Sequence, residues 1–197
     1  NSGCFGYFFA LDYFLSQYHK PLTDSQKWRI SQAMYRVFLE GHVGNAFDLA
    51  DHKGITIESR YSVKEYEHAT MLKTTPLFLL GLWIMAAIYD VPQQKVTELE
   101  QAIHLLCLGF QILNDLEAQD PKNSQFGNDL LEKKMSFPLL VFWETHSETD
   151  PKKAEFVALF NGPYSQETNL KFRNLIDTAV KESYERVNQV QKTLEEH

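Results

Sequence analysis

Amide and carboxylate side chains follow directly on an apolar segment near the middle of the chain. Residues 106–113 are apolar except for Gln111, and Asn114, Asp115 and further acidic residues come next. A helix that is apolar on all sides is surrounded by other helices, so polar groups on it cost about 1–3 kcal/mol each unless they find partners. A ligand-filled cavity would supply partners, and carboxylates there would bind a hard cation such as Mg²⁺ together with substrate phosphates. The alternative is a buried hydrogen-bond network that fixes helix register.

Lysines at two further places could bind an anion. Lys73 is followed by Thr74 and Thr75 at the expected start of a helix, where free backbone N–H groups and the helix dipole favour negative charge. Lys133 and Lys134 follow a polar loop and could face the same cavity. The alternative for each lysine is a surface position, with the alkyl chain on apolar surface and the ammonium group in water.

One helical stripe changes from apolar to polar along its length. Its residues recur at steps of three and four, which places them on one face of a helix, and they are Ile30, Met34, Phe38, Gly41, Asn45 and Asp48. An amphipathic helix normally keeps carboxylates on the opposite face. The polar end therefore either reaches the same cavity or emerges into solvent.

The elements that must position these residues are helices, because apolar residues recur at helical spacing almost throughout the chain. Thr23 and Gln26 have the spacing of a capping box at the start of a helix. The expected helices span residues 4–19, 24–50, 63–71, 74–89, 92–118, 128–146 with a kink or restart at Pro138, 151–160 and 165–195. The pattern predicts an all-α bundle with short connections, in a single domain over residues 1–197.

Composition narrows the possible functions. The chain has 197 residues, of which 44% are hydrophobic, and a formal net charge of -7. Such a charge argues against general nucleic-acid binding, which needs a basic surface, although a local basic pocket remains compatible with it. The most apolar run covers residues 76–89, which is shorter than the roughly 18 residues of a membrane span. We therefore expect no integral membrane segment and a cytoplasmic protein.

Five segments in order resemble the polyprenyl synthetase family, the trans-isoprenyl diphosphate synthases. GNAFDL at 44–49 resembles the family's Gly-Gln-x-x-Asp-Leu, and YEHATMLKTTPLF at 66–78 resembles Tyr-x-x-x-x-x-x-Lys-Thr-x-x-Leu-Phe. GFQILNDLEA at 109–118 resembles the second aspartate-rich motif, Phe-Gln-x-x-Asp-Asp-x-x-Asp. GNDLLEKKMSFPLL at 127–140 resembles Gly-x-Asp-x-x-x-x-Lys-x-Ser/Thr-x-Pro. GYFFALDYFL at 6–15 resembles the segment after the first aspartate-rich motif.

The resemblance implies a fold and a reaction. The fold is an isoprenoid-synthase-type helical bundle around a central cavity. The family binds an allylic diphosphate through three Mg²⁺ ions between two aspartate-rich helices, and ionisation gives an allylic cation that isopentenyl diphosphate attacks before a proton is lost. The expected substrates are therefore isopentenyl diphosphate and an allylic prenyl diphosphate, and the expected assembly is a homodimer.

The resemblance also implies roles for individual residues. Lys73 and Lys134 would hold the allylic diphosphate, and Thr74 and Gln111 would lie near the cation and the departing proton. Asn114 and Asp115 would bind Mg²⁺. The remaining candidates for contact with substrate are Phe110, Asn45 and Asp48.

The sequence departs from the family pattern at the metal ligands. The first aspartate-rich motif is absent from the chain, so we expect it upstream of Asn1, on N-terminal helices that this sequence lacks. Asn114 and Ala118 replace the first and last aspartates of the second motif, and Asn45 replaces a glutamine. Asparagine is neutral and is a weaker Mg²⁺ ligand than a carboxylate.

Three functions follow. The first is a divergent Mg²⁺-dependent prenyltransferase that makes a longer polyprenyl diphosphate, favoured by the retained Lys73, Thr74, Gln111, Asp115 and Lys134. The second is a non-catalytic or regulatory subunit with the same fold, favoured by the altered metal ligands. The third, a class I terpene cyclase, fits less well, because the positions four and eight after Asn114 lack the serine and glutamate of a cyclase metal triad.

Overall fold

The structure is a computed structural model that describes residues 12, 16, 22–50 and 55–196, with the side chains of 47–50 left out. In this part of the chain every regular element is a helix, which confirms the all-α prediction. The helices are α2 (Asp24–Ala50), α3 (Val63–Lys73), α4 (Thr75–Ile88), α5 (Gln93–Glu117), α6 (Asn128–Glu132), α7 (Phe137–Thr145), α8 (Pro151–Asn161), α9 (Gln166–Leu175) and α10 (Asp177–Glu195). The expected helix at 4–19 lies outside the described residues, apart from Asp12 and Ser16, which are both helical.

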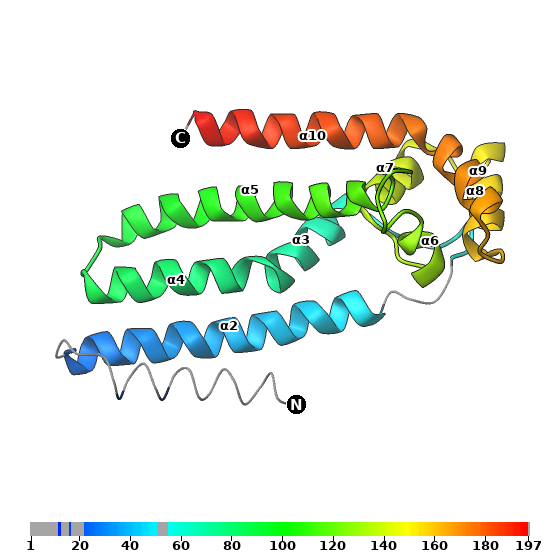
Figure 1. Ribbon diagram of the computed structural model, residues 1–197. Coiled ribbons are helices and arrows are strands. Elements are labelled where there is room, and N and C mark those ends of the chain that lie inside the picture. The colour runs from blue at the N-terminus through cyan, green and yellow to red at the C-terminus, as the bar shows by residue number, and fades with distance from the viewer. Residues whose placement is uncertain (1–11, 13–15, 17–21, 51–54, 197) are drawn as a thin grey trace.

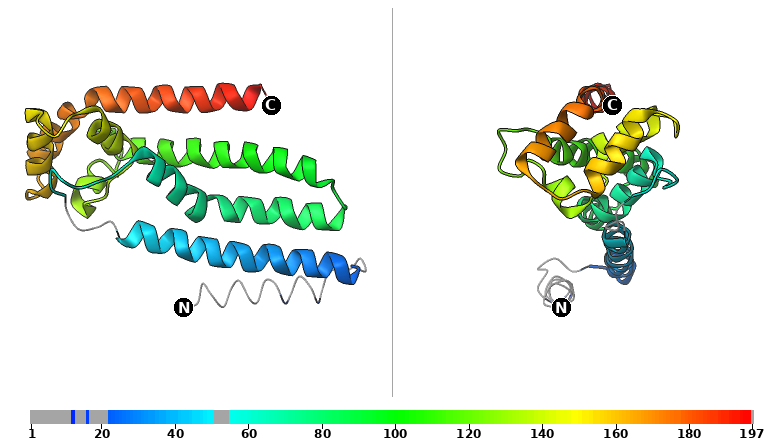
Figure 2. Two further views of the ribbon diagram at one scale, coloured as in Figure 1. Left: turned by 180° about the vertical axis from the view of Figure 1, so that it is seen from behind. Right: turned by 90° about the vertical axis from the view of Figure 1, so that its right-hand side faces the viewer.

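The long helices run alongside one another, and the short ones gather at one end. Figure 1 shows α2, α4, α5 and α10 as successive rods, and Figure 2 shows the same order from behind. The closest packing joins α2 to α3 and α4, α4 to α5, and α10 to α5 and α7. Helices α6 to α9 lie around the C-terminal end of α5 and the N-terminal end of α10 (Figure 1). The short helices therefore close one end of the bundle.

The start of α2 forms the predicted capping box. Thr23 N donates to Gln26 Oε1 at 3.0 Å, and Gln26 N donates to Thr23 Oγ1 at 3.2 Å. The same glutamine donates to Ile88 O at 3.1 Å, and Arg29 donates to Asp90 at 2.9 Å. These contacts join the start of α2 to the end of α4.

Two predicted helices are interrupted. The restart expected at Pro138 is confirmed: the helix at 128–146 is divided into α6 and α7, because Lys133 has a left-handed φ of 57° and Pro138 lies in the first turn of α7. The expected helix at 165–195 is divided into α9 and α10 at Ile176, which is fully buried. The first interruption creates the turn that carries Lys134.

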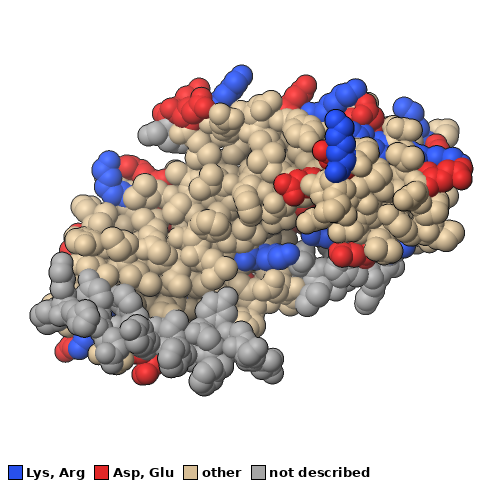
Figure 3. Space-filling view, in the orientation of Figure 1, with Lys and Arg blue, Asp and Glu red and all other residues tan. Residues whose placement is uncertain are grey.

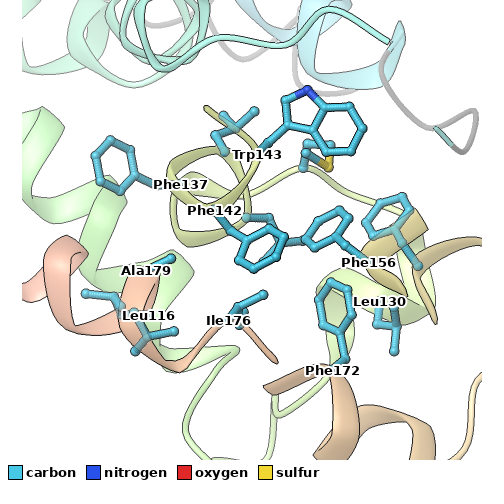
Figure 4. Close-up of a cluster of buried hydrophobic side chains, with 14 of the residues drawn as sticks. Leu116, Leu130, Phe137, Phe142, Trp143, Phe156, Phe172, Ile176 and Ala179 are labelled. Carbon is cyan, nitrogen blue, oxygen red and sulfur yellow. The ribbon is translucent and has the colours of Figure 1, made fainter. Parts of the chain in front are cut away.

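Aromatic side chains form the core where the short helices meet α5 and α10 (Figure 4). Phe142 stacks on Phe156 with ring centroids 5.0 Å apart, and Phe172 lies 4.9 Å from the same ring. Burying such a side chain contributes about 1.5–3 kcal/mol. This aromatic cluster packs α7, α8 and α9 against one another, next to the turn between α6 and α7.

One face of the long helices carries few charges. In Figure 3 uncharged atoms dominate the area over α4 and α5. Among the described residues no single helix is long and apolar enough to span a membrane. Helices α3 and α4, bent by 47° at the break between them, reach the length and apolar composition of a span only when taken together.

Candidate functional site

A cavity of about 470 Å³ lies between α3, the start of α4, α5 and the turn between α6 and α7. Its polar lining comes from elements far apart in the sequence. Lys73, Thr74, Gln111 and Lys134 all line it, and Thr74 Oγ1 donates to Gln111 Oε1 at 3.3 Å. The structure therefore brings together four of the residues that the sequence singled out.

The lining carries an excess of positive charge. The cationic lining residues are Arg60, Lys64, Lys73 and Lys134. The acidic residue in the lining is Glu65. Glu65 is also engaged as a capping residue, since Ser62 Oγ donates to its Oε2 at 2.9 Å. A cationic cavity in a chain with a net charge of -7 is suited to an anionic ligand.

A close helix contact places Lys73. A Cβ atom added to Gly44 of α2 would lie 2.4 Å from the backbone nitrogen of Lys73. Only glycine therefore permits α2 to approach the last turn of α3 this closely. The backbone at Lys73 is fixed by this contact, which also explains the glycine in the segment at 44–49.

Asp115 lies behind the cavity wall and is 4% exposed. Its Oδ2 accepts from the Tyr66 hydroxyl at 2.7 Å and from Phe137 N at 3.0 Å, and its Oδ1 accepts from Gln111 Nε2 at 3.1 Å. Burial raises the pKa of Tyr66 well above its usual value, and the charge of Asp115 adds to the rise. Tyr66 therefore stays protonated as a donor, and Asp115 joins α3, α5 and α7.

The adjacent lysines Lys133 and Lys134 have different positions. Lys133 Nζ donates to Gly162 O at 2.8 Å and to Phe160 O, at the end of α8. Burial lowers the pKa of Lys133. Lys134 lines the cavity, so one lysine anchors the turn to α8 while the next one faces the cavity.

The sequence as a whole matches a known family. The family model described as polyprenyl synthetase matches residues 1–173. The chain belongs to the polyprenyl synthetase family.

A solved structure supports the same fold. The crystal structure of a polyprenyl synthase from Roseobacter denitrificans is similar, with a TM-score of 0.69 and 17% identity over 84% of this chain. The match covers 54% of that synthase, so the chain spans about half of its length. No curated protein matches the chain significantly. The predicted isoprenoid-synthase-type bundle is confirmed.

The residues predicted to bind Mg²⁺ do not fit a metal site. Neighbours on a helix point about 100° apart, and Asn114 is exposed whereas Asp115 is buried. Both carboxylate oxygens of Asp115 already accept hydrogen bonds. Among the side chains that the structure describes, no three from His, Cys, Asp or Glu form a group that could hold a metal ion. The geometry therefore gives no support to Asn114 and Asp115 as a ligand pair.

Two further candidates, Phe110 and Asn45, lie away from the cavity lining. Phe110 is 50% exposed, and Asn45 is exposed near the end of α2. Neither lines the cavity, so the structure does not bring them to the site. The side chain of Asp48 lies outside the described residues.

A second buried carboxylate, that of Asp129, was given no role from the sequence. It is 7% exposed, and its Oδ2 accepts from Gln119 Nε2 at 2.8 Å and from Ser136 Oγ at 2.5 Å. Burial raises its pKa to about 7, with a further contribution from the charge of Asp115. The signal that could have identified it is its position in the segment at 127–140, where Asp129 matches the aspartate of the family's Gly-x-Asp.

Sequence reasoning also missed the cavity residues on and before α3. They include Arg60, Lys64, Tyr66 and His68. Residues 64 and 68 are one helical turn apart, so their spacing was a signal for a shared face. A charged pair on a solvent-exposed helix face has the same spacing in the sequence. Only the position of the cavity distinguishes a lining pair from a surface pair.

Proposed function

We propose that this protein condenses isopentenyl diphosphate with an allylic diphosphate to give a longer polyprenyl diphosphate. The observation that carries the proposal is the meeting of Lys73, Thr74, Gln111 and Lys134 on one cavity. These side chains come from α3, the start of α4, α5 and the turn between α6 and α7. A bundle with a purely structural role has no need to direct these groups to one hollow.

The chemistry of the lining suits ionisation of a diphosphate. Lys73 and Lys134 would bind the diphosphate and stabilise the charge that grows on it as the C–O bond breaks. Thr74 and Gln111, which contact each other, would present oxygen atoms near the allylic cation. Met135 and Leu140 also line the cavity and would exclude the water that quenches a carbocation.

A non-catalytic subunit is the second candidate. Asn114 and Asp115 favour it, because the amide of Asn114 is a weaker Mg²⁺ ligand than a carboxylate and both carboxylate oxygens of Asp115 already accept hydrogen bonds. The use of Mg²⁺, a homodimeric assembly and a cytoplasmic location stay predictions.

Turnover by the intact protein tests the proposal. Isopentenyl diphosphate, dimethylallyl diphosphate and MgCl₂ are supplied, and pyrophosphate and prenyl products are measured. We expect pyrophosphate together with a longer prenyl diphosphate, and loss of both in Lys73→Ala. Lys122→Ala, at an exposed loop position, is the matched control.

The other outcomes separate the alternatives. Pyrophosphate release that needs no isopentenyl diphosphate identifies a cyclase. No turnover alone, combined with binding to an active synthase, identifies a subunit.

A further inference from the structure

The turn of residues 133–136, between α6 and α7, brings Lys134 to the cavity. A residue with a buried carboxylate, Asp129, contacts this turn at the backbone of Lys134 and at the side chain of Ser136. We propose that Asp129 is a positioning residue that holds Lys134 in the orientation needed to bind a diphosphate. The inference rests on the proposed function, because it requires Lys134 to contact the anionic substrate.

Asp129 contacts the turn through its backbone and its side chain. Its backbone oxygen accepts from Lys134 N at 2.8 Å, and its Oδ2 accepts from Ser136 Oγ at 2.5 Å. Gln119 Nε2 donates to the same Oδ2 at 2.8 Å. Two of the turn's residues are therefore attached to Asp129, which Gln119 in turn holds near the end of α5.

Other contacts fix the two ends of the turn. Asp115 Oδ2 accepts from Phe137 N at 3.0 Å, where α7 begins, and Lys133 Nζ donates to Gly162 O at 2.8 Å. At the start of α6, Gly127 has a φ of +85°, and a Cβ atom there would lie 2.2 Å from Asn169 Nδ2. Asp129 thus sits on a short helix whose own start is fixed against α9.

The location of Asp129 argues for a role beyond packing. A buried carboxylate is costly to desolvate, and the positive charge of Lys134 lies close enough to Asp129 to lower its pKa. The acceptor atoms of Asp129 also order the turn that carries this lysine. Ordering a side chain before the ligand arrives lowers the conformational cost of binding, and a long flexible lysine gains most from this.

Binding of inorganic pyrophosphate to the intact protein, measured by titration calorimetry, tests the inference. Lys134→Ala is expected to weaken binding about tenfold, the effect of losing one charged hydrogen bond. Asp129→Ala is expected to weaken it by a similar factor. Asp129→Asn retains an oxygen acceptor for Ser136 and is expected to bind within about twofold of wild type. Asp120→Ala, an acidic residue of the exposed loop, is the matched control and is expected to have no effect.

The double variant distinguishes positioning from a general loss of structure. If Asp129 acts through Lys134, then Asp129→Ala combined with Lys134→Ala binds pyrophosphate no more weakly than Lys134→Ala alone. If the double variant weakens pyrophosphate binding by the product of the two single fold-changes, the inference is overturned. It is also overturned if Asp129→Ala binds pyrophosphate as tightly as wild type. If Asp129→Ala fails to fold, Ser136→Ala removes the same contact and must weaken binding for the inference to stand.

Failure of the proposed function has a different signature. If the wild-type protein binds pyrophosphate and Lys134→Ala binds it equally well, the role assigned to Lys134 is wrong, and the inference is wrong with it. If Lys134→Ala weakens binding while Asp129→Ala and Ser136→Ala do not, only the positioning role is overturned.

Discussion

The Tyr66 hydroxyl donates a 2.7 Å hydrogen bond to Asp115 Oδ2 and so joins the helix that ends at Lys73 to the helix that carries Gln111. Both helices supply walls of the cavity. Because Asp115 is buried, each donor that it loses leaves its carboxylate with fewer hydrogen bonds in the interior, which costs stability. The contact therefore couples the stability of the bundle to the geometry of the cavity.

Tyr66→Phe removes this donor and is expected to lower the free energy of unfolding by about 1–3 kcal/mol. Urea denaturation measures the change. Tyr35→Phe, at a side chain that is 67% exposed, is the control and is expected to change stability by less than about 0.5 kcal/mol. Equal effects of the two substitutions would show that the Tyr66 contact adds nothing.

Gly44→Ala is expected to push α2 away from the end of α3. The added Cβ atom would meet the backbone of Lys73 at 2.4 Å, and overpacking of this kind costs about 1–3 kcal/mol. Pyrophosphate binding is expected to weaken as well, because the backbone at Lys73 must shift.

Gly41→Ala is the matched control for that change, since a Cβ atom there has nothing within 4 Å. Alanine in a helix is favoured over glycine by about 1 kcal/mol, so this variant is expected to be as stable as wild type or more so. Thermal melting of Gly44→Ala and Gly41→Ala measures the difference in stability between them. A stable Gly44→Ala variant with unchanged binding would contradict the proposed contact.

Lys73→Ala is expected to weaken pyrophosphate binding by about tenfold, the value of one charged hydrogen bond, with little loss of stability. Its side chain lines a cavity and is not part of the buried core. Calorimetry gives the dissociation constant, and a melting curve gives the stability. Unfolding of the variant without a specific loss of binding would assign Lys73 a structural role.

Asp129 is expected to make stability depend on pH. Burial raises its pKa to about 7 in the folded protein from an ordinary value of 3.8, so between these values the folded state binds more protons than the unfolded chain. Stability from this group is thus fully present below about pH 4 and is lost as the pH rises through about 7, with a total on the order of a few kcal/mol.

The comparison with Asp129→Asn isolates this effect. The free energy of unfolding of wild type relative to that variant is expected to fall between pH 5 and pH 8. Asp120→Asn provides the control for removal of an acid at an exposed position. Parallel pH profiles for wild type and Asp129→Asn would show that Asp129 does not titrate in this range.

The local signals in the sequence correctly predicted several features. Helical spacing of apolar residues predicted the helices, and the Thr23 and Gln26 pair predicted the start of α2, because both depend on contacts within a few residues. Lys73, Thr74, Gln111 and Lys134 were singled out from their types, their spacing and the resemblance to the family, and all four line the cavity. The interruption at Ile176 was missed, because burial of this side chain in the aromatic core decides it.

The sequence by itself determined the helical class and the set of polar groups placed on apolar helices, since periodicity and residue type are local properties. Only the tertiary structure decided which of those groups share a cavity. It separated Lys133 from Lys134, and it buried Asp115 against Tyr66 while leaving Asn114 exposed. The physical reason is that a residue's partners come from helices far away in the chain, and the packing of those helices selects which oxygen and nitrogen atoms meet.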